Sequence, residues 1–188
     1  MDSDPRADLF KLDSFSVDGF PCRRLGPLPY LRGVRFAAGT PITATVPLLR
    51  LTLEATAPST DDPNHDKSDH GLVVPDFFGA NEEMPIISKR MLAVLKAQAD
   101  NYVVYPVALI DEESGREIDS HVAINVLGVV PDEQWCVDSS AIGPLRMFRM
   151  ASYKLWVVDA SIRQALIAAG IDTLRFRSLK GCAGKGDE

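Results

Sequence analysis

The distribution of proline over the first third of the chain constrains the fold more than any other sequence feature. Each proline fixes φ and removes a backbone N–H, so closely spaced prolines break up any long helix. We therefore expect residues 1–57 to be irregular and strand-like, with short strands at 9–12 and 47–53. Seven prolines lie in the first 60 residues: Pro5, Pro21, Pro27, Pro29, Pro41, Pro47 and Pro58.

Two helices are predicted further along the chain. Ser88 can accept an orphan N–H of a first helical turn, which favours a helix over about 89–99. Asp159 can cap a second helix at about 160–169 in the same way. Gly170 favours the left-handed backbone conformation that is common directly after a helix. The apolar residues at helical spacing are Met91, Leu92, Leu95 and Ala99 in the first helix, and Ile162, Leu166 and Ala169 in the second.

Strands outnumber these helices and do not alternate regularly with them, which predicts an α+β fold with a mainly antiparallel sheet. We expect one domain, 1–188, with a main α+β core at 73–178 and a frayed tail at 180–188. Residues 58–70 contain no large apolar side chain and are expected to form a mobile acidic loop. The later strands are expected at 102–110, 121–130, 135–137, 145–150, 154–158 and 173–176.

Composition excludes some classes of protein. The chain has 188 residues, of which 46% are hydrophobic and 24% charged, so it can form a core and is not wholly disordered. Its formal net charge is −6, which argues against a nucleic-acid partner, because such binding depends on clustered lysine and arginine. An acidic chain can still bind a basic protein.

We expect neither a signal peptide nor a membrane span. The first 15 residues are acidic and polar, unlike a signal peptide, and no run of 18 apolar residues predicts a membrane span. The three cysteines are Cys22, Cys136 and Cys182. This odd, widely spaced set favours free thiols in a reducing compartment, so we expect a cytoplasmic protein without a membrane partner.

Several residue groups resemble catalytic or ligand sites but have simpler interpretations. His65, Asp66, Asp69 and His70 are metal-ligand types, yet they lie in a loop with no apolar residue to order it, so we expect no metal. Residues 181–186 resemble a phosphate loop but lack its first glycine, its Ser or Thr and the following helix, so we expect no cofactor. Cys136 and His121 could form a nucleophile–base pair, but packing in an apolar strand explains the cysteine, and we expect His121 to be a polar residue at the head of a strand rather than a base.

An enzyme with a site assembled from residues distant in the sequence is the alternative function. Its most suitable polar members are Asp138, Ser139 and Arg149. Turn capping explains the first two equally well, and an ion pair inside or at the end of a strand explains the arginine. No recognisable nucleophile, base and orienting group occur together, so we expect no catalytic residue.

Acidic residues gather at 61–83 and at 111–119. They form either an ordinary solvated surface or a binding surface that attracts a basic partner. We take Glu112, Glu113 and Glu117 as candidate partner-binding residues, together with Asp138, Ser139 and Arg149.

A pattern of spaced residues over about 44–178 resembles immunity-protein family eleven of bacterial polymorphic toxin systems, formerly a domain of unknown function. The chain departs from that pattern in the long loop at 58–70 and in lacking a Gly-x-Phe ending, and residues 1–43 carry little of the match. The matching positions are 74–78 (VPDFF), 85–88 (PIIS), 105–107 (YPV), Asn125, 136–138 (CVD) with Ser139 or Ser140, 148–150 (FRM) and 157–158 (VV), followed by a capped helix and a closing strand with 170–171 (GI) and 175–176 (RF).

The resemblance implies a small, non-catalytic α+β protein that binds a cognate toxin encoded nearby and blocks it in the cytoplasm. The family does not fix which toxin is bound, so no toxin activity is implied. The oligomeric state is left open.

Overall fold

The computed structural model describes residues 9–14, 23–29, 31, 33–55, 74–79, 84–133, 136–137, 141–153 and 155–179. Within them lie two α-helices, α1 (Lys89–Lys96) and α2 (Ala160–Ala168), and a short 3-10 helix at Phe36–Ala38. The strands are β1 (Leu9–Ser14), β2 (Arg23–Leu25), β3 (Leu49–Ala55), β4 (Phe77–Phe78), β5 (Ile86–Ser88), β6 (Tyr102–Asp111), β7 (Glu117–Ile118), β8 (His121–Val126), β9 (Val129–Val130), β10 (Asp132–Glu133), β11 (Cys136–Val137), β12 (Met147–Met150), β13 (Trp156–Asp159) and β14 (Leu174–Ser178).

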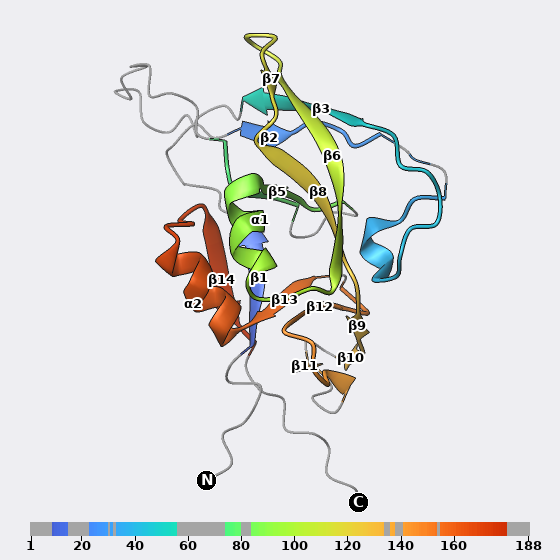
Figure 1. Cartoon of the computed structure of the whole chain (residues 1–188), viewed down its shortest axis with the longest axis vertical. Helices are drawn as coiled ribbons and strands as arrows, with labels where there is room; N and C mark the ends of the chain where they lie inside the picture. Colours follow the sequence, from blue (N-terminus) through green and yellow to red (C-terminus); the bar gives the residue numbers. More distant parts are fainter. Residues whose placement is uncertain are drawn as a thin grey trace, which may run out of the picture.

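These strands form two sheets and a small hairpin, which confirms the α+β prediction (Figure 1). One sheet has the order β14-β1-β13-β12-β9. The other has the order β2-β3-β6-β8-β5-β4, with β7 also paired to β6, while β10 pairs with β11. Among the described strands, only β3 with β6 and β9 with β12 run parallel, so the sheets are mainly antiparallel.

The N-terminal strands belong to both sheets. β1 lies between β13 and β14, and its Leu12 is fully buried. β3 pairs with β6 in the other sheet, and its Leu49, Leu51 and Leu53 face a core, as their alternation predicts. Residues before position 57 therefore build the same two sheets as the later part of the chain.

Both helices begin as predicted, because the capping side chains accept the expected N–H groups. Ser88 Oγ accepts from Met91 N at 3.1 Å, and an Asp159 carboxylate oxygen accepts from Ile162 N at 2.8 Å. The helices end at Lys96 and Ala168, slightly earlier than expected, and each is followed by a turn. Gly170 has φ +69°, the left-handed conformation predicted there.

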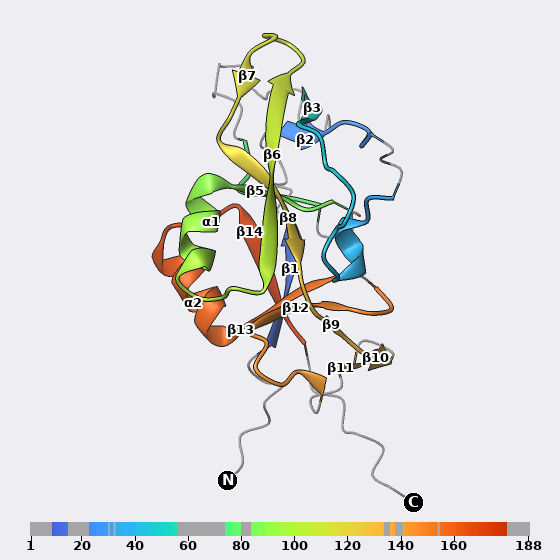
Figure 2. The ribbon, with the colours of Figure 1, turned by 45° about the vertical axis from the view of Figure 1, so that its right-hand side comes forward.

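The helices lie side by side on one side of the molecule and pack against both sheets (Figures 1 and 2). Their buried apolar residues enter one core, which contains Leu12 of β1, Ile124 of β8 and Trp156 of β13. This shared core joins the two sheets. The buried helical residues are Met91, Leu92 and Leu95 in α1, and Ile162 and Leu166 in α2. Ala169, predicted on the apolar stripe of the second helix, lies past the end of α2 and is exposed.

Two strand predictions need correction. The strand expected at 121–130 is two strands, because the chain breaks at Leu127 and at Gly128, whose φ is +108°. The strand expected at 145–150 begins at Met147, and all four of its residues are buried, because both of its faces are covered. The predicted loop at 58–70 and tail at 180–188 lie outside the described residues.

Candidate functional site

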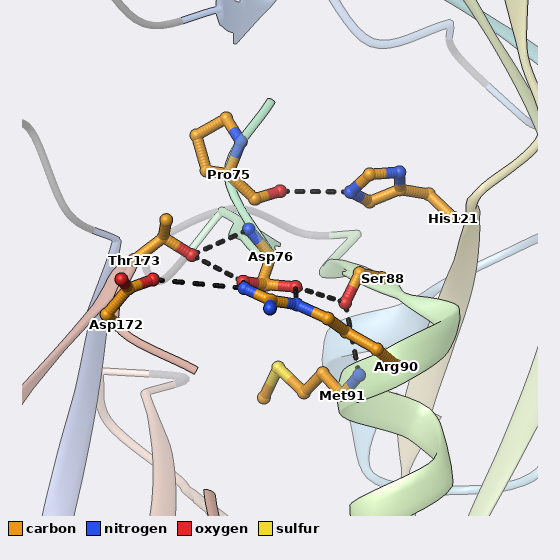
Figure 3. A network of polar contacts seen from close by, with 8 residues as sticks. All are labelled: Pro75, Asp76, Ser88, Arg90, Met91, His121, Asp172 and Thr173. Atoms are coloured by element: carbon orange, nitrogen blue, oxygen red, sulfur yellow. Dashed lines mark hydrogen bonds and ion pairs between the residues drawn. The ribbon is translucent and has the colours of Figure 1, made fainter. Parts of the chain in front are cut away.

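The most extensive polar network in the described structure centres on Asp76, just before β4 (Figure 3). Asp76 Oδ1 accepts from Ser88 Oγ at 2.5 Å and from Arg90 Nε at 2.7 Å. Its Oδ2 accepts from Arg90 Nη2 at 2.5 Å and from Thr173 Oγ1 at 2.9 Å. The backbone N–H of Asp76 also donates to Thr173 Oγ1, at 2.8 Å.

This network sets the ionisation state of Asp76. Burial alone would raise the pKa of its carboxyl group, but hydrogen bonds from Arg90, Ser88 and Thr173 outweigh burial and lower the pKa below its ordinary value. Asp76 is therefore a fixed carboxylate at neutral pH. Both of its oxygens are engaged, so it is suited to holding structure rather than to accepting a substrate proton.

His121 lies nearby and is also fully engaged. Its Nε2 is 2.9 Å from the carbonyl of Pro75, and its Nδ1 is 2.9 Å from Ser120 Oγ. A carbonyl can only accept, so Nε2 carries the proton and Nδ1 accepts from the serine hydroxyl. Burial lowers the pKa of His121, against the opposing effects of the Pro75 carbonyl and Asp76, and keeps the ring neutral. The interpretation of His121 as a strand-end polar residue agrees with this geometry.

Of the three residues in the enzyme alternative, the structure describes only Arg149. Arg149 is 1% exposed in β12, and burial lowers the pKa of its guanidinium to about 10, so it stays charged at neutral pH. Its burial removes it from any surface that a partner could contact without rearrangement. Asp138 and Ser139 lie outside the described residues, as does the side chain of Cys136.

The remaining candidate residues, Glu112, Glu113 and Glu117, all lie on the β6–β7 hairpin. β6 continues past the end of its pairing with β8 and turns at 112–114 into β7, so the hairpin projects from the end of the sheet (Figures 1 and 2). Glu112 and Glu113 are exposed. Between positions 111 and 119 the chain has five acidic residues and one arginine. We call residues 111–119 the acidic hairpin.

The hairpin is fixed to the sheet at its base. The backbone N–H of Glu112 donates to the carbonyl of Leu53 in β3 at 3.0 Å. Glu117 forms an ion pair with Arg50 of β3 at 3.3 Å, and both side chains are more than half exposed. An exposed pair of this kind adds little stability, but it holds one of the glutamates in place.

Two further findings bear on ligands. Among the described residues, no three His, Cys, Asp or Glu side chains are grouped so as to hold a metal ion, and His65, Asp66, Asp69 and His70 lie outside that part of the chain. Neither described helix has the length and apolar character needed to cross a membrane.

Comparison with known proteins gives no family. No protein-family model matches the chain, and no curated protein matches it.

Sequence reasoning found Ser88 as a helix cap but missed the network that it joins. Asp76 and Thr173 are 97 residues apart, and nothing in their local sequence predicts that they meet. The one local signal is the placement of Asp76 between Pro75 and Phe77, since a charge between apolar residues is a sign of a buried, bonded carboxylate.

Proposed function

We propose that this chain is a non-catalytic binding protein that neutralises a bacterial toxin encoded beside it, in the cytoplasm of the cell that makes both. The observation that supports this most is the acidic hairpin. It gathers exposed carboxylates on a projection fixed to a sheet, where a basic surface of another protein can reach them. The resemblance to the immunity-protein family supplies the class of partner.

The acidic hairpin favours a fast association rate rather than a slow dissociation rate. Exposed like charges raise the rate of encounter with an oppositely charged partner, and ionic strength screens that effect. A protein that must intercept a toxin before it acts benefits from such steering.

The engaged polar groups favour binding over catalysis as well. The carboxylate of Asp76 and both ring nitrogens of His121 are committed to internal hydrogen bonds. Either would have to give up those bonds before it could act as a general base.

A binding measurement between this chain and the product of the neighbouring gene tests the proposal. We expect a 1:1 complex by size-exclusion chromatography and a Kd below one micromolar by calorimetry. Absence of a complex at micromolar concentrations, or a neighbouring gene that encodes no toxic protein, would contradict it.

A further inference from the structure

Strand β6 is paired on both sides only along its second half. Residues 102–106 pair with β8, but β3 pairs only with residues 107–111. No other described strand lies against residues 102–106 on the side away from β8. We call this segment the open edge of β6.

The hydrogen bonds around β6 show which backbone groups face outward. Leu127 N–H donates to the carbonyl of Asn101, and Glu112 N–H donates to that of Leu53 in β3. Asn101 thus bonds toward β8 and Glu112 toward β3. Because the backbone groups of successive residues in a strand point to opposite sides, the odd-numbered residues of β6 bond to β8, and the even-numbered ones face β3 or the open edge. The groups at the open edge are accordingly those of Tyr102, Val104 and Pro106.

Few of these groups are available to a new strand. Tyr102 N–H already donates to the carbonyl of Asp100 at 2.9 Å. Pro106 has no N–H. Because β3 runs parallel to β6 with Leu49 opposite Val107, the carbonyl of Pro106 faces the N–H of Leu49. The open edge thus offers one donor, Val104 N–H, and two acceptors, the carbonyls of Tyr102 and Val104.

The side chains along the open edge are apolar and accessible. Val103 and Val104 point to opposite faces of the sheet and are 36% and 38% exposed. Leu48, just before β3 begins, is 51% exposed. Natural edge strands are commonly protected by charges, prolines or bulges. Here residues 102–105 (YVVY) have no charge, and proline follows only at 106.

We propose that an extended strand of a different protein adds to the sheet at the open edge of β6. This inference rests on the proposed function, because it names the surface through which the chain would hold its protein partner. Main-chain bonds would supply affinity, and the side chains opposite Val103 and Val104 would supply specificity.

A second copy of this chain fits the open edge poorly. In an antiparallel pair centred on Val104, each Tyr102 carbonyl would face Pro106 of the other copy, which has no N–H to donate. In a pair centred on Val103, each Val104 carbonyl would face a Tyr102 N–H that already bonds to Asp100. A foreign strand can supply both missing donors, so the edge is complementary to a different sequence.

The chemistry of the open edge defines that foreign strand. It is apolar on both faces where it passes Val103 and Val104. It has a lysine or arginine at the end that meets Asp100, an exposed residue two positions before β6 begins. It also lacks proline at the two positions that donate to the carbonyls of Tyr102 and Val104.

Val104→Pro tests this arrangement, because the N–H that it removes points away from β8, so pairing within the sheet is kept. Val104→Lys is the second variant and applies if the proline variant fails to fold. Ile167→Lys is the matched control, since Ile167 is an exposed apolar residue on α2, outside β6. Two probes are used: a displayed library of random twelve-residue peptides, and the product of the neighbouring gene.

We expect the library to yield peptides with consecutive apolar residues and a basic residue at one end. Both Val104 variants should weaken their binding tenfold or more, and Ile167→Lys should change it less than twofold. In the free protein, the amide of Val104 should exchange with deuterium much faster than that of Val103. A library that returns no such peptide, peptides that bind the Val104 variants like wild type, or slow exchange at Val104 would each overturn the proposal.

The two probes separate the failure of this inference from the failure of the proposed function. If the neighbouring product binds wild type and both Val104 variants equally, the function stands and the open edge is not its surface. If that product does not bind but the peptides bind in a Val104-dependent way, the open edge stands and the proposed partner is wrong.

Discussion

At the scale of single residues, Asp76 shows how a buried charge can hold distant segments together. Its carboxylate receives hydrogen bonds from Ser88 at the start of α1, from Arg90 within α1 and from Thr173 before β14. The same carboxylate thus ties the seven-stranded sheet to the segment that leads into the five-stranded sheet. A buried carboxylate is costly unless it is bonded in this way.

Asp76→Asn should lower the free energy of unfolding at pH 7 by about 2–4 kcal/mol, the scale for breaking a buried, charge-assisted set of hydrogen bonds. Folding lowers the pKa of Asp76 below its ordinary value of 3.8. The ionised carboxylate therefore stabilises the fold fully at pH values above this ordinary pKa, and that stabilisation is lost as the pH falls through the pKa of the folded state. Urea titrations at pH 7 and pH 3 should therefore show a smaller difference between wild type and variant at pH 3.

Asp119→Asn is the control for that change, because the Asp119 carboxylate is exposed and lies 3.7 Å from Lys89. It should leave the urea midpoint unchanged at both pH values. An Asp76→Asn difference that is equally large at pH 3 would show that the charge is not what stabilises this site.

Glycines with the same backbone conformation allow a second test at this scale. Gly39 and Gly115 have φ of +66° and +67°, but a Cβ on Gly39 would lie 2.2 Å from Val129 Cγ2, whereas one on Gly115 would meet nothing within 4 Å. Gly115→Ala should cost about 1 kcal/mol from backbone strain alone. Gly39→Ala should cost at least about 1 kcal/mol more, because the added methyl group must displace Val129. Equal losses in thermal unfolding would contradict the close packing of Gly39.

At the scale of elements, the sequence predicts those helices and strands that depend on residues close together in the chain. Caps at Ser88 and Asp159 locate both helix starts, and alternating leucines locate β3. Strands β4 and β5 were not predicted, since two- and three-residue strands carry no periodicity and form only because they pair with each other and with β8. The break at Gly128 was also missed, because an isolated glycine in an apolar run is compatible with a continuous strand.

Leu95→Ala tests the assigned face of α1. Leu95 is fully buried in the core that both helices and both sheets share, so its loss should destabilise the protein by about 2–4 kcal/mol. Chemical denaturation would measure this, with Ala93→Ser on the exposed side of the helix as a near-neutral control. An effect of Leu95→Ala below about 0.5 kcal/mol would mean that another face of α1 is buried.

At the scale of the whole molecule, the N-terminal and later strands interlock in two sheets that share one core. That arrangement depends on pairings between distant residues, such as Leu12 with Phe176, which no local pattern encodes. The α+β class follows from counting elements, but the open edge of β6 does not, because it exists only where β3 stops pairing. The acidic hairpin could be predicted, since both its charges and its turn are local.

The acidic hairpin should control the association rate. Replacing Glu112, Glu113 and Glu117 together by glutamine should slow association with the partner, and added salt should slow wild type more than this variant. Dissociation should change less. Surface-plasmon kinetics at several ionic strengths would measure both rates. A salt-independent association rate would remove the steering role while leaving binding itself intact.

The most direct test of the central claim is protection of growing cells. Bacteria that express the product of the neighbouring gene from an inducible promoter should stop growing, and co-expression of this chain should restore growth through a complex that can be purified from the same cells. If co-expression leaves growth arrested although the chain accumulates in folded form, the claim that it neutralises this partner is wrong.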